Sequence, residues 1–370
     1  MAKHQDNWVT IPSELIGSIP RSAELVEAQR TCKDGELTRD QLALLQEKDL
    51  QTVLFELEQT GSIQLTDGEL SKPSFFSYSI YELAQYKFSF DERNLPTITD
   101  VHGHQRSFPQ LINAPFCYGT FAVEYLRTAQ KYTKHPLKQA IIAPSALSLV
   151  YMNETIEHYS REDFLNDLIN EAEKDVRRCL KAGADKVQLD FAKTELTLKI
   201  DSNGNLLKES IEINNRMLDR FSSEEQKKLG VHVCSANENE KSQSSHDIDY
   251  LEVLEEVFQL HLNNFYIQLS SETDPEKILS LIGRLIQPHQ RVFIGVINPT
   301  SQRVETVEEV RDIVLKASRY IPMDQLGTTD DCGFAPYNDV ESISREKCYE
   351  KIRARIEGTK LAEEILNQLL

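Results

Sequence analysis

The sequence predicts an α/β fold, a single (β/α)8 TIM barrel, because short apolar runs alternate with longer amphipathic segments. Several of the short runs have consecutive apolar residues, as parallel strands buried on both faces do. The chain has 370 residues, of which 40% are hydrophobic, enough for one barrel domain over 1–370. The proposed strands are 13–18, 62–66, 139–144, 185–191, 230–234, 265–270, 291–297 and 325–329.

Helices are expected between these strands. In the segment 163–183 apolar residues recur at three- and four-residue spacing, which is typical of an amphipathic helix, and Gly183 supplies its end. A later segment opens with Asp274 as the expected N-cap and Pro275 in the first turn. Residues 70–138 do not fit the alternation. We expect them to form a long insertion after the second strand, with a hairpin and a helix, over the mouth of the barrel.

The formal net charge of −18 argues against negatively charged partners. Nucleic acids and anionic membranes bind proteins through clustered Lys and Arg side chains, and no basic face is expected here. The N-terminal segment lacks a basic stretch followed by an apolar run, and no stretch approaches the roughly 20 apolar residues of a spanning helix. We therefore expect a soluble, cytoplasmic protein without nucleic-acid or membrane partners. Homodimer formation stays open.

Three residues are candidate metal ligands. His232 and Cys234 form an H-x-C pair at the end of the fifth proposed strand, where the two-residue period directs both side chains to the same face. Cys332 follows the eighth proposed strand, and a barrel gathers the residues after its strands at one mouth. One imidazole and two thiolates suit a catalytic zinc ion. From spacing alone, the alternative of a buried cysteine beside a structural histidine stays open.

With these motifs in place, the chain resembles the catalytic domain of cobalamin-independent methionine synthase and its shorter single-barrel relatives, from residue 14 to residue 366. In that family an H-x-C after strand five and a cysteine in a D/Q-C-G segment after strand eight bind catalytic zinc. The resemblance assigns these roles to His232, Cys234 and Cys332, and implies zinc as the cofactor.

Three further segments resemble the substrate site of that family. LIGSIPRS is similar to its I-G-S-x-P turn, which holds homocysteine, and implies substrate binding at Ile16, Gly17 and Ser18. LTDGE and VQLD resemble segments that supply carboxylates for the substrate ammonium, here Glu69 and Asp190. Each match alone is compatible with an ordinary turn or strand end. Together, and in the order of the family, they indicate a thiol amino acid such as homocysteine.

The sequence departs from the family pattern at the fourth zinc ligand and on the donor side. The family has a glutamate on strand six, and this chain has Gln268, whose neutral amide is a poorer ligand; Glu272 is an alternative. The donor-side positions that differ are Phe191, Val150 or Tyr151, and Thr300, which stand where the family has glutamate, tryptophan and histidine.

These features predict a zinc-dependent methyltransferase that transfers a methyl or alkyl group to the thiol of homocysteine or a similar small thiol. With zinc bound, the substrate thiol would be held as a thiolate, the nucleophilic form, and would attack the carbon of the donor. No residue is assigned as a general acid or base. Two alternatives stay open. One is a zinc enzyme with a non-folate electrophile such as methylcobalamin, an epoxide or a specialised metabolite, and the other is a non-catalytic binding protein.

Overall fold

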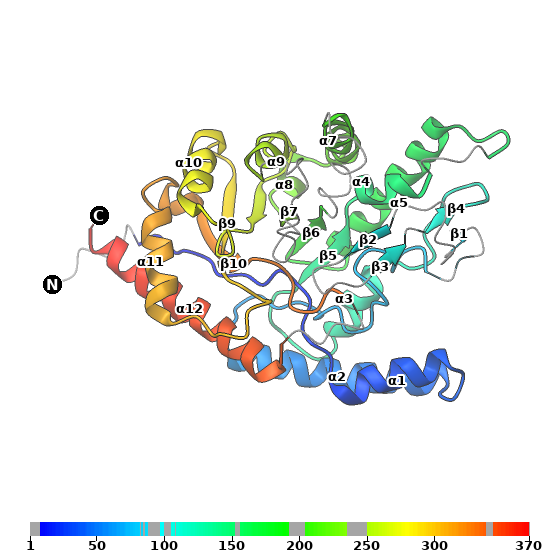
Figure 1. The fold of residues 1–370 in the computed structure, drawn as a ribbon, viewed down its shortest axis with the longest axis horizontal. Coiled ribbons are helices and arrows are strands. Elements are labelled where there is room, and N and C mark those ends of the chain that lie inside the picture. The colour runs from blue at the N-terminus through cyan, green and yellow to red at the C-terminus, as the bar shows by residue number, and fades with distance from the viewer. Residues whose placement is uncertain are drawn as a thin grey trace. The chain divides into compact units, whose positions relative to one another are not determined.

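The computed structural model describes residues 8–81, 83, 86–87, 97–99, 105–107, 109–151, 156–191, 204–234, 250–337 and 343–369. The chain divides into two compact units, whose elements Figure 1 labels. The first unit comprises Met1–Ser71, Ala129–Lys138 and Asn263–Leu370, and the second comprises Lys72–Thr128 and Gln139–Leu262. The assignment of 1–370 to a single domain stays a prediction.

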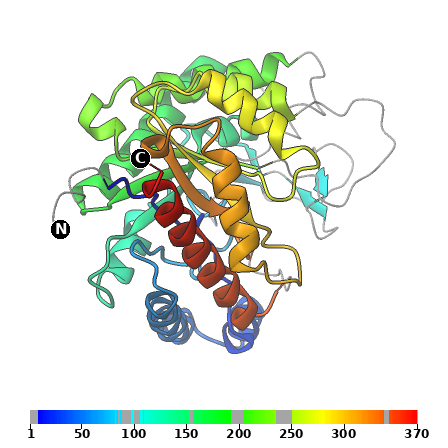
Figure 2. The same cartoon turned by 90° about the vertical axis from the view of Figure 1, so that its left-hand side faces the viewer.

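The first unit packs helices against parallel strands. Its strands have the order β10–β9–β8, and both neighbouring pairs are parallel. Helices α11 and α12 lie beside each other and pack against these strands (Figure 2). The elements are α1 (Ala23–Lys33), α2 (Arg39–Gln59), β8 (Asn264–Ile267), α10 (Pro275–Leu285), β9 (Arg291–Ile297), α11 (Val307–Ala317), the 3-10 helix η2 (Met323–Gln325), β10 (Leu326–Asp330) and α12 (Arg345–Asn367).

The first two proposed strands are shorter than expected. Each forms one parallel bridge, Ser13 with Thr328 and Leu65 with Leu137, instead of a longer ladder. In the first of these segments, the Glu14 amide donates to the Thr328 carbonyl oxygen and the Thr328 amide donates to the Pro12 carbonyl oxygen, each at 2.9 Å. The other six proposed strands are present as β5 to β10, with ends that differ from the expected ones by up to three residues.

The second unit also joins helices to parallel strands, in the order β7–β6–β5. Within the segment 70–138, β2 and β3 form an antiparallel pair and α3 follows, so the expected hairpin and helix are confirmed. The elements are β1 (Tyr86–Lys87), β2 (Thr97–Thr99), β3 (Gln105–Ser107), β4 (Gln110–Leu111), α3 (Val123–Ala129), β5 (Lys138–Ile142), α4 (Pro144–Leu147), the 3-10 helix η1 (Ser148–Tyr151), α5 (Arg161–Lys181), β6 (Lys186–Asp190), α7 (Asn205–Leu218), α8 (Ser223–Gln226), β7 (Leu229–Val233) and α9 (Tyr250–Val257).

The expected cap at Asp274 is confirmed, and α5 begins with a cap that was not predicted from the sequence. Asp274 accepts a hydrogen bond from the Lys277 amide at the start of α10, with Pro275 in the first turn. Ser160 forms a reciprocal capping box with Asp163 at the start of α5. The apolar face expected for α5 is buried. None of the helices in the described ranges is both long and apolar enough to cross a membrane.

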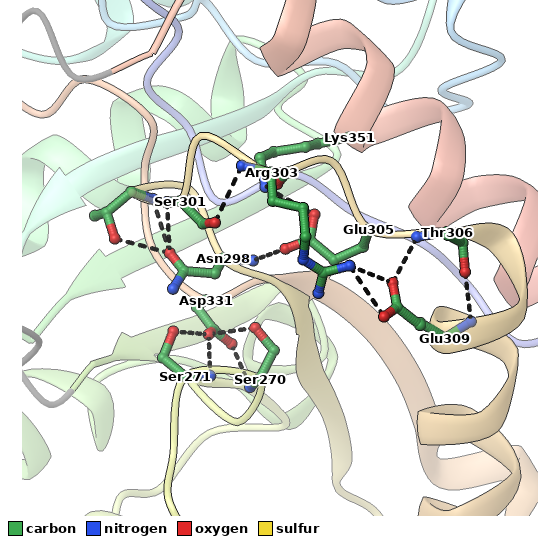
Figure 3. Close-up of polar contacts among 11 residues, drawn as sticks. Ser270, Ser271, Asn298, Ser301, Arg303, Glu305, Thr306, Glu309, Asp331 and Lys351 are labelled. Carbon is green, nitrogen blue, oxygen red and sulfur yellow. Dashed lines mark hydrogen bonds and ion pairs between the residues drawn. The ribbon is translucent and has the colours of Figure 1, made fainter.

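A buried ion pair fixes the loop after β9 to α12 in the first unit (Figure 3). Lys351 is fully buried, and its Nζ donates to Glu305 Oε2 at 2.8 Å and to the Arg303 carbonyl oxygen. Glu305 Oε1 also accepts from the Asn298 amide at 2.9 Å. Because both charges are removed from water, each depends on the other for compensation.

Replacing Glu305 by glutamine should therefore lower the free energy of unfolding by about 3 kcal/mol, since it leaves the Lys351 ammonium buried without its charge partner. Urea unfolding of the full chain at pH 7 measures this change. The exposed Glu308→Gln, on the same helix-loop segment, is the control and should change stability by less than about 0.5 kcal/mol. Equal effects of the two substitutions would contradict the prediction.

A buried carboxylate ties α5 to the insertion in the second unit. Asp175 accepts hydrogen bonds from Tyr78 Oη at 2.6 Å and from the Ala122 amide at 2.7 Å. Burial raises the pKa of Asp175 to about 6, although these two hydrogen bonds act in the opposite direction. The folded state therefore binds a proton at Asp175 in a pH range where the unfolded chain has released it.

The stability contributed by Asp175 should fall as the pH rises from about 4 to about 6, because in this window the folded state binds more protons than the unfolded state. Raising the pKa from 3.8 to about 6 corresponds to about 3 kcal/mol. Between pH 4 and pH 7, the unfolding free energy of the wild type should fall relative to that of Asp175→Asn by up to this amount. Parallel curves for the two proteins, like those expected for the exposed Asp40→Asn control, would refute the assignment.

Candidate metal centre

His232 and Cys234 lie at the carboxyl end of β7 in the second unit. The strand Leu229–Val233 is buried along its length, and His232 is 6% exposed. Cys234 follows directly after the strand and is partly exposed. The Val233 carbonyl oxygen accepts a hydrogen bond from Tyr250 Oη at 3.2 Å, which fastens the end of the strand to α9. The apolar residues of β7 bury the strand, and the His232 imidazole therefore lies at the end of a buried strand.

Asp190 occupies the corresponding end of the neighbouring strand β6. It pairs in parallel register with His232, so the two residues are opposite each other on adjacent strands. The Phe191 amide donates to the His232 carbonyl oxygen at 3.0 Å and continues this pairing. Asp190 is buried and its Oδ1 accepts from Gln188 Nε2 at 2.8 Å. Parallel register therefore puts a carboxylate beside the candidate imidazole ligand.

Cys332 follows β10 in the first unit, and its position depends on the glycine after it. A Cβ atom on Gly333 would lie 2.2 Å from Ser18 Oγ, so only glycine allows this approach. Ser18 Oγ accepts from the Ala335 amide at 3.1 Å, and the Ser18 carbonyl oxygen accepts from the Phe334 amide at 3.0 Å. The loop that carries Cys332 is thereby fastened to the LIGSIPRS segment.

The three candidate ligands come together. The ligand atoms of His232, Cys234 and Cys332 all lie within 4.8 Å of one another. One imidazole and two sulfurs bind zinc and other thiophilic ions in preference to magnesium or calcium. The convergence expected from the sequence is confirmed as a group that could hold a metal ion.

Gln268 lies directly after β8 and is buried, with 5% of its surface exposed. Its Nε2 donates to Glu272 Oε1 at 2.8 Å. The two residues considered as a further ligand are therefore hydrogen-bonded to each other. Which of them would bind the metal stays a prediction.

Two consecutive carboxylates precede Cys332, and both are buried. Asp330 pairs with Arg355 on α12 and accepts from the Ile16 amide at 3.1 Å. Asp331 accepts hydrogen bonds from residues 269–271, which follow β8. Burial raises the pKa of both carboxyls, and the hydrogen bonds and, for Asp330, the Arg355 charge oppose that shift. A register shift between β9 and β10 occurs at this point, as is common beside functional sites.

The segments expected to bind substrate are close-fitting and partly strained. Glu69 is buried and has a φ of 55°, a left-handed conformation that non-glycine residues rarely adopt. Arg21 Nη2 donates to the Glu69 carbonyl oxygen at 2.7 Å, and Arg21 Nε donates to the Leu70 carbonyl oxygen at 3.1 Å. Arg21 Nη1 also donates to the Tyr337 carbonyl oxygen at 3.0 Å. Strain of this kind is typical of functional sites and persists only where neighbours enforce it.

The turn at Ile16, Gly17 and Ser18 is held by two other segments of the first unit, residues 66–68 and residues 330–335. Thr66 Oγ1 donates to the Gly17 carbonyl oxygen at 2.7 Å, and the Ile19 amide donates to the Gly68 carbonyl oxygen at 3.0 Å. The Ser18 side chain is 1% exposed. Substrate binding at these residues, at Glu69 and at Asp190 stays a prediction.

Sequence reasoning did not assign roles to Arg21, Asp331 or Gly333. All three lie beside residues that the motifs did single out, in SIPRS and TTDDCG. That proximity was the available signal. What each side chain contacts depends on chain segments far away in the sequence, so the motif alone could not identify it.

Comparison with known proteins identifies relatives along nearly the whole chain. A methionine synthase of Sulfurisphaera tokodaii is 25% identical over 362 residues, covering 98% of this chain and 95% of the relative. A methionine synthase of Saccharolobus solfataricus is 23% identical over 365 residues, covering 97% and 96%. These homologues are methyltransferases by name, as the sequence led us to expect.

Solved structures share the fold. The B12-independent methionine synthase of Shewanella sp. W3-18-1, in complex with selenomethionine, superposes with a TM-score of 0.73 at 20% identity, covering 98% of this chain and all of the other. A putative vitamin-B12-independent methionine synthase of Listeria monocytogenes gives a TM-score of 0.69 at 18% identity, covering 97% and 99%. These neighbours are TIM-barrel domains, which confirms the predicted fold class.

The family model of the cobalamin-independent synthase catalytic domain matches residues 11–347. The match includes every candidate ligand and substrate residue named above, and confirms the resemblance inferred from the motifs. The chain belongs to the family of cobalamin-independent synthase catalytic domains.

Proposed function

We propose that this chain is a zinc-dependent methyltransferase that methylates the thiol of homocysteine or a close analogue. The observation that carries the proposal is the convergence of His232, Cys234 and Cys332, whose ligand atoms lie within 4.8 Å of one another. Two thiolates and an imidazole fit zinc by donor type. Zinc at such a site supplies Lewis acidity, which lowers the pKa of a coordinated thiol.

The remaining residues of the proposal bind and orient the amino acid. Glu69 and Asp190 are buried carboxylates that could accept the substrate ammonium, and the backbone at Gly17 and Ser18 could hold its carboxylate. Asp190 lies in register beside His232, which supports its place near the thiol. The Shewanella relative was solved with selenomethionine, the selenium analogue of methionine, and this supports a sulfur amino acid as the ligand class here. We propose that the protein acts in the cytoplasm.

A second candidate differs only in the methyl donor. Thr300 stands where the family has a histidine, and its Oγ1 donates to Asn298 Oδ1 at 2.8 Å within the loop after β9. Phe191 and Val150 are buried apolar side chains at two other donor positions. These residues cannot donate a proton to a departing folate nitrogen as an imidazole would. They favour a non-folate donor, such as methylcobalamin, an epoxide or a specialised metabolite, with the same zinc and thiol.

The metal assignment predicts that the purified protein holds about one zinc ion per chain and that Cys234→Ser and Cys332→Ser each weaken zinc binding by more than about 100-fold. Methyl transfer to homocysteine should be lost in both variants. Zinc content by mass spectrometry and chelator competition measure the first effect, and methionine formation measures the second. Cys32→Ser, on α1, is the matched control and should leave both unchanged. A metal-replete wild type without zinc would eliminate the proposal.

The substrate assignment predicts that Glu69→Gln raises the KM for homocysteine by about 10- to 100-fold, because a hydrogen bond between charged groups contributes about 1.5–3 kcal/mol. Zinc content should stay at the wild-type level, which separates this effect from damage to the metal centre. The exposed Glu36→Gln serves as control. An unchanged KM in Glu69→Gln would remove this residue from the substrate site.

A panel of methyl donors assayed in parallel, with folate and non-folate members, distinguishes the two candidate functions. Thermal stabilisation by homocysteine without turnover would indicate a non-catalytic binding protein.

A further inference from the structure

The Asp331 carboxylate, adjacent in sequence to Cys332, accepts five hydrogen bonds from residues 269–271, among them those of Ser270 and Ser271 (Figure 3). Its Oδ1 accepts from the amides of Leu269 and Ser270, each at 2.9 Å. Its Oδ2 accepts from Ser270 Oγ at 2.6 Å, and from the Ser271 amide at 2.8 Å and Ser271 Oγ at 2.5 Å. The side chain is 1% exposed. A single buried carboxylate thus holds three consecutive residues of another segment.

The arrangement requires a carboxylate. All five partners are donors, and an ionised carboxylate is the side chain with two oxygens that accept and no hydrogen to donate. An asparagine at this position would present one acceptor oxygen and an NH2 group. The NH2 group would face the Ser271 amide or the Ser270 amide, neither of which can accept a hydrogen bond.

Asp331 connects Cys332 to the segment that carries the two residues considered as a further ligand, Gln268 and Glu272. It is adjacent in sequence to Cys332, and the three residues that it holds separate Gln268 from Glu272, which are hydrogen-bonded to each other. Gly295 on β9 provides the space, because a Cβ atom there would lie 1.9 Å from Asp331 Oδ1. The ends of β8, β9 and β10 are therefore packed together around one carboxylate.

We propose that Asp331 is a positioning residue of the metal centre, which couples the backbone at Cys332 to the segment that carries Gln268 and Glu272. Asp331 acts through its neighbours and is not itself a ligand. The proposal rests on the proposed function, since it presupposes metal at Cys332. Residues that orient ligands in this way typically change metal affinity by 10- to 100-fold when replaced.

The test uses the full chain loaded with Co²⁺ in place of zinc, because thiolate-to-cobalt absorption reports the ligand geometry directly. Asp331→Asn should weaken metal binding by about 10- to 100-fold and should alter this absorption spectrum. Ser271→Ala removes one of the five donors, the Ser271 hydroxyl, and should have a smaller effect in the same direction. If Asp331→Asn does not fold, the double variant Ser270→Ala, Ser271→Ala replaces it, since it keeps the carboxylate and loses both hydroxyl donors.

Glu305→Gln is the matched control, because it breaks a buried contact in the same unit without touching residues 269–271. It should lower stability and leave the cobalt spectrum and the metal affinity of the folded protein as in the wild type. If the Asp331 and serine variants also keep the wild-type affinity and spectrum, the positioning role is overturned while the proposed function stands. If the wild type itself shows no thiolate-to-cobalt absorption, the proposed function fails and this inference fails with it.

Discussion

Two consecutive buried carboxylates, Asp330 and Asp331, lie at the end of β10 and determine the position of the Cys332 backbone. Removing a carboxylate from water costs several kcal/mol, so each must have specific partners. Asp330 is compensated by Arg355 on α12 and by the Ile16 amide, whereas Asp331 is compensated by the segment after β8. The chain can satisfy both only in one arrangement of these segments. The position of the Cys332 backbone follows from that requirement.

Gln268 departs from the glutamate that the family resemblance implies for the fourth ligand. In the proposed zinc site, Gln268 would offer the ion a neutral oxygen where the family resemblance implies a glutamate, so the ion would keep more positive charge. The Gln268 Nε2 atom donates a hydrogen bond to Glu272 Oε1, so the amide lies beside a carboxylate. An amide ordered in this way loses less conformational freedom on binding than a mobile side chain would. Rigid surroundings can thus offset part of what the ligand lacks.

Much of the fold could be predicted from local patterns. Consecutive apolar runs identified β5 to β10, and three- and four-residue spacing identified helices such as α5, because both depend on residues close together in sequence. The strands expected at 13–18 and 62–66 form single bridges at Ser13 and Leu65 instead of ladders, and the local patterns do not distinguish the two outcomes. His232 and Cys234 were recognisable for a similar local reason, as two residues at the end of one strand. Cys332 was recognisable because a barrel gathers the residues after its strands at one mouth, and the family resemblance then assigned it the role of a zinc ligand.

The strained backbone at Glu69 has a consequence for ligand recognition. Arg21 already holds this residue in its left-handed conformation through the Glu69 and Leu70 carbonyl oxygens. The loss of entropy from ordering the loop therefore occurs when the protein folds, and an arriving ligand does not incur it. Such preorganisation would let a small zwitterion, with few atoms to contribute contacts, bind through the full strength of each charged hydrogen bond that it forms.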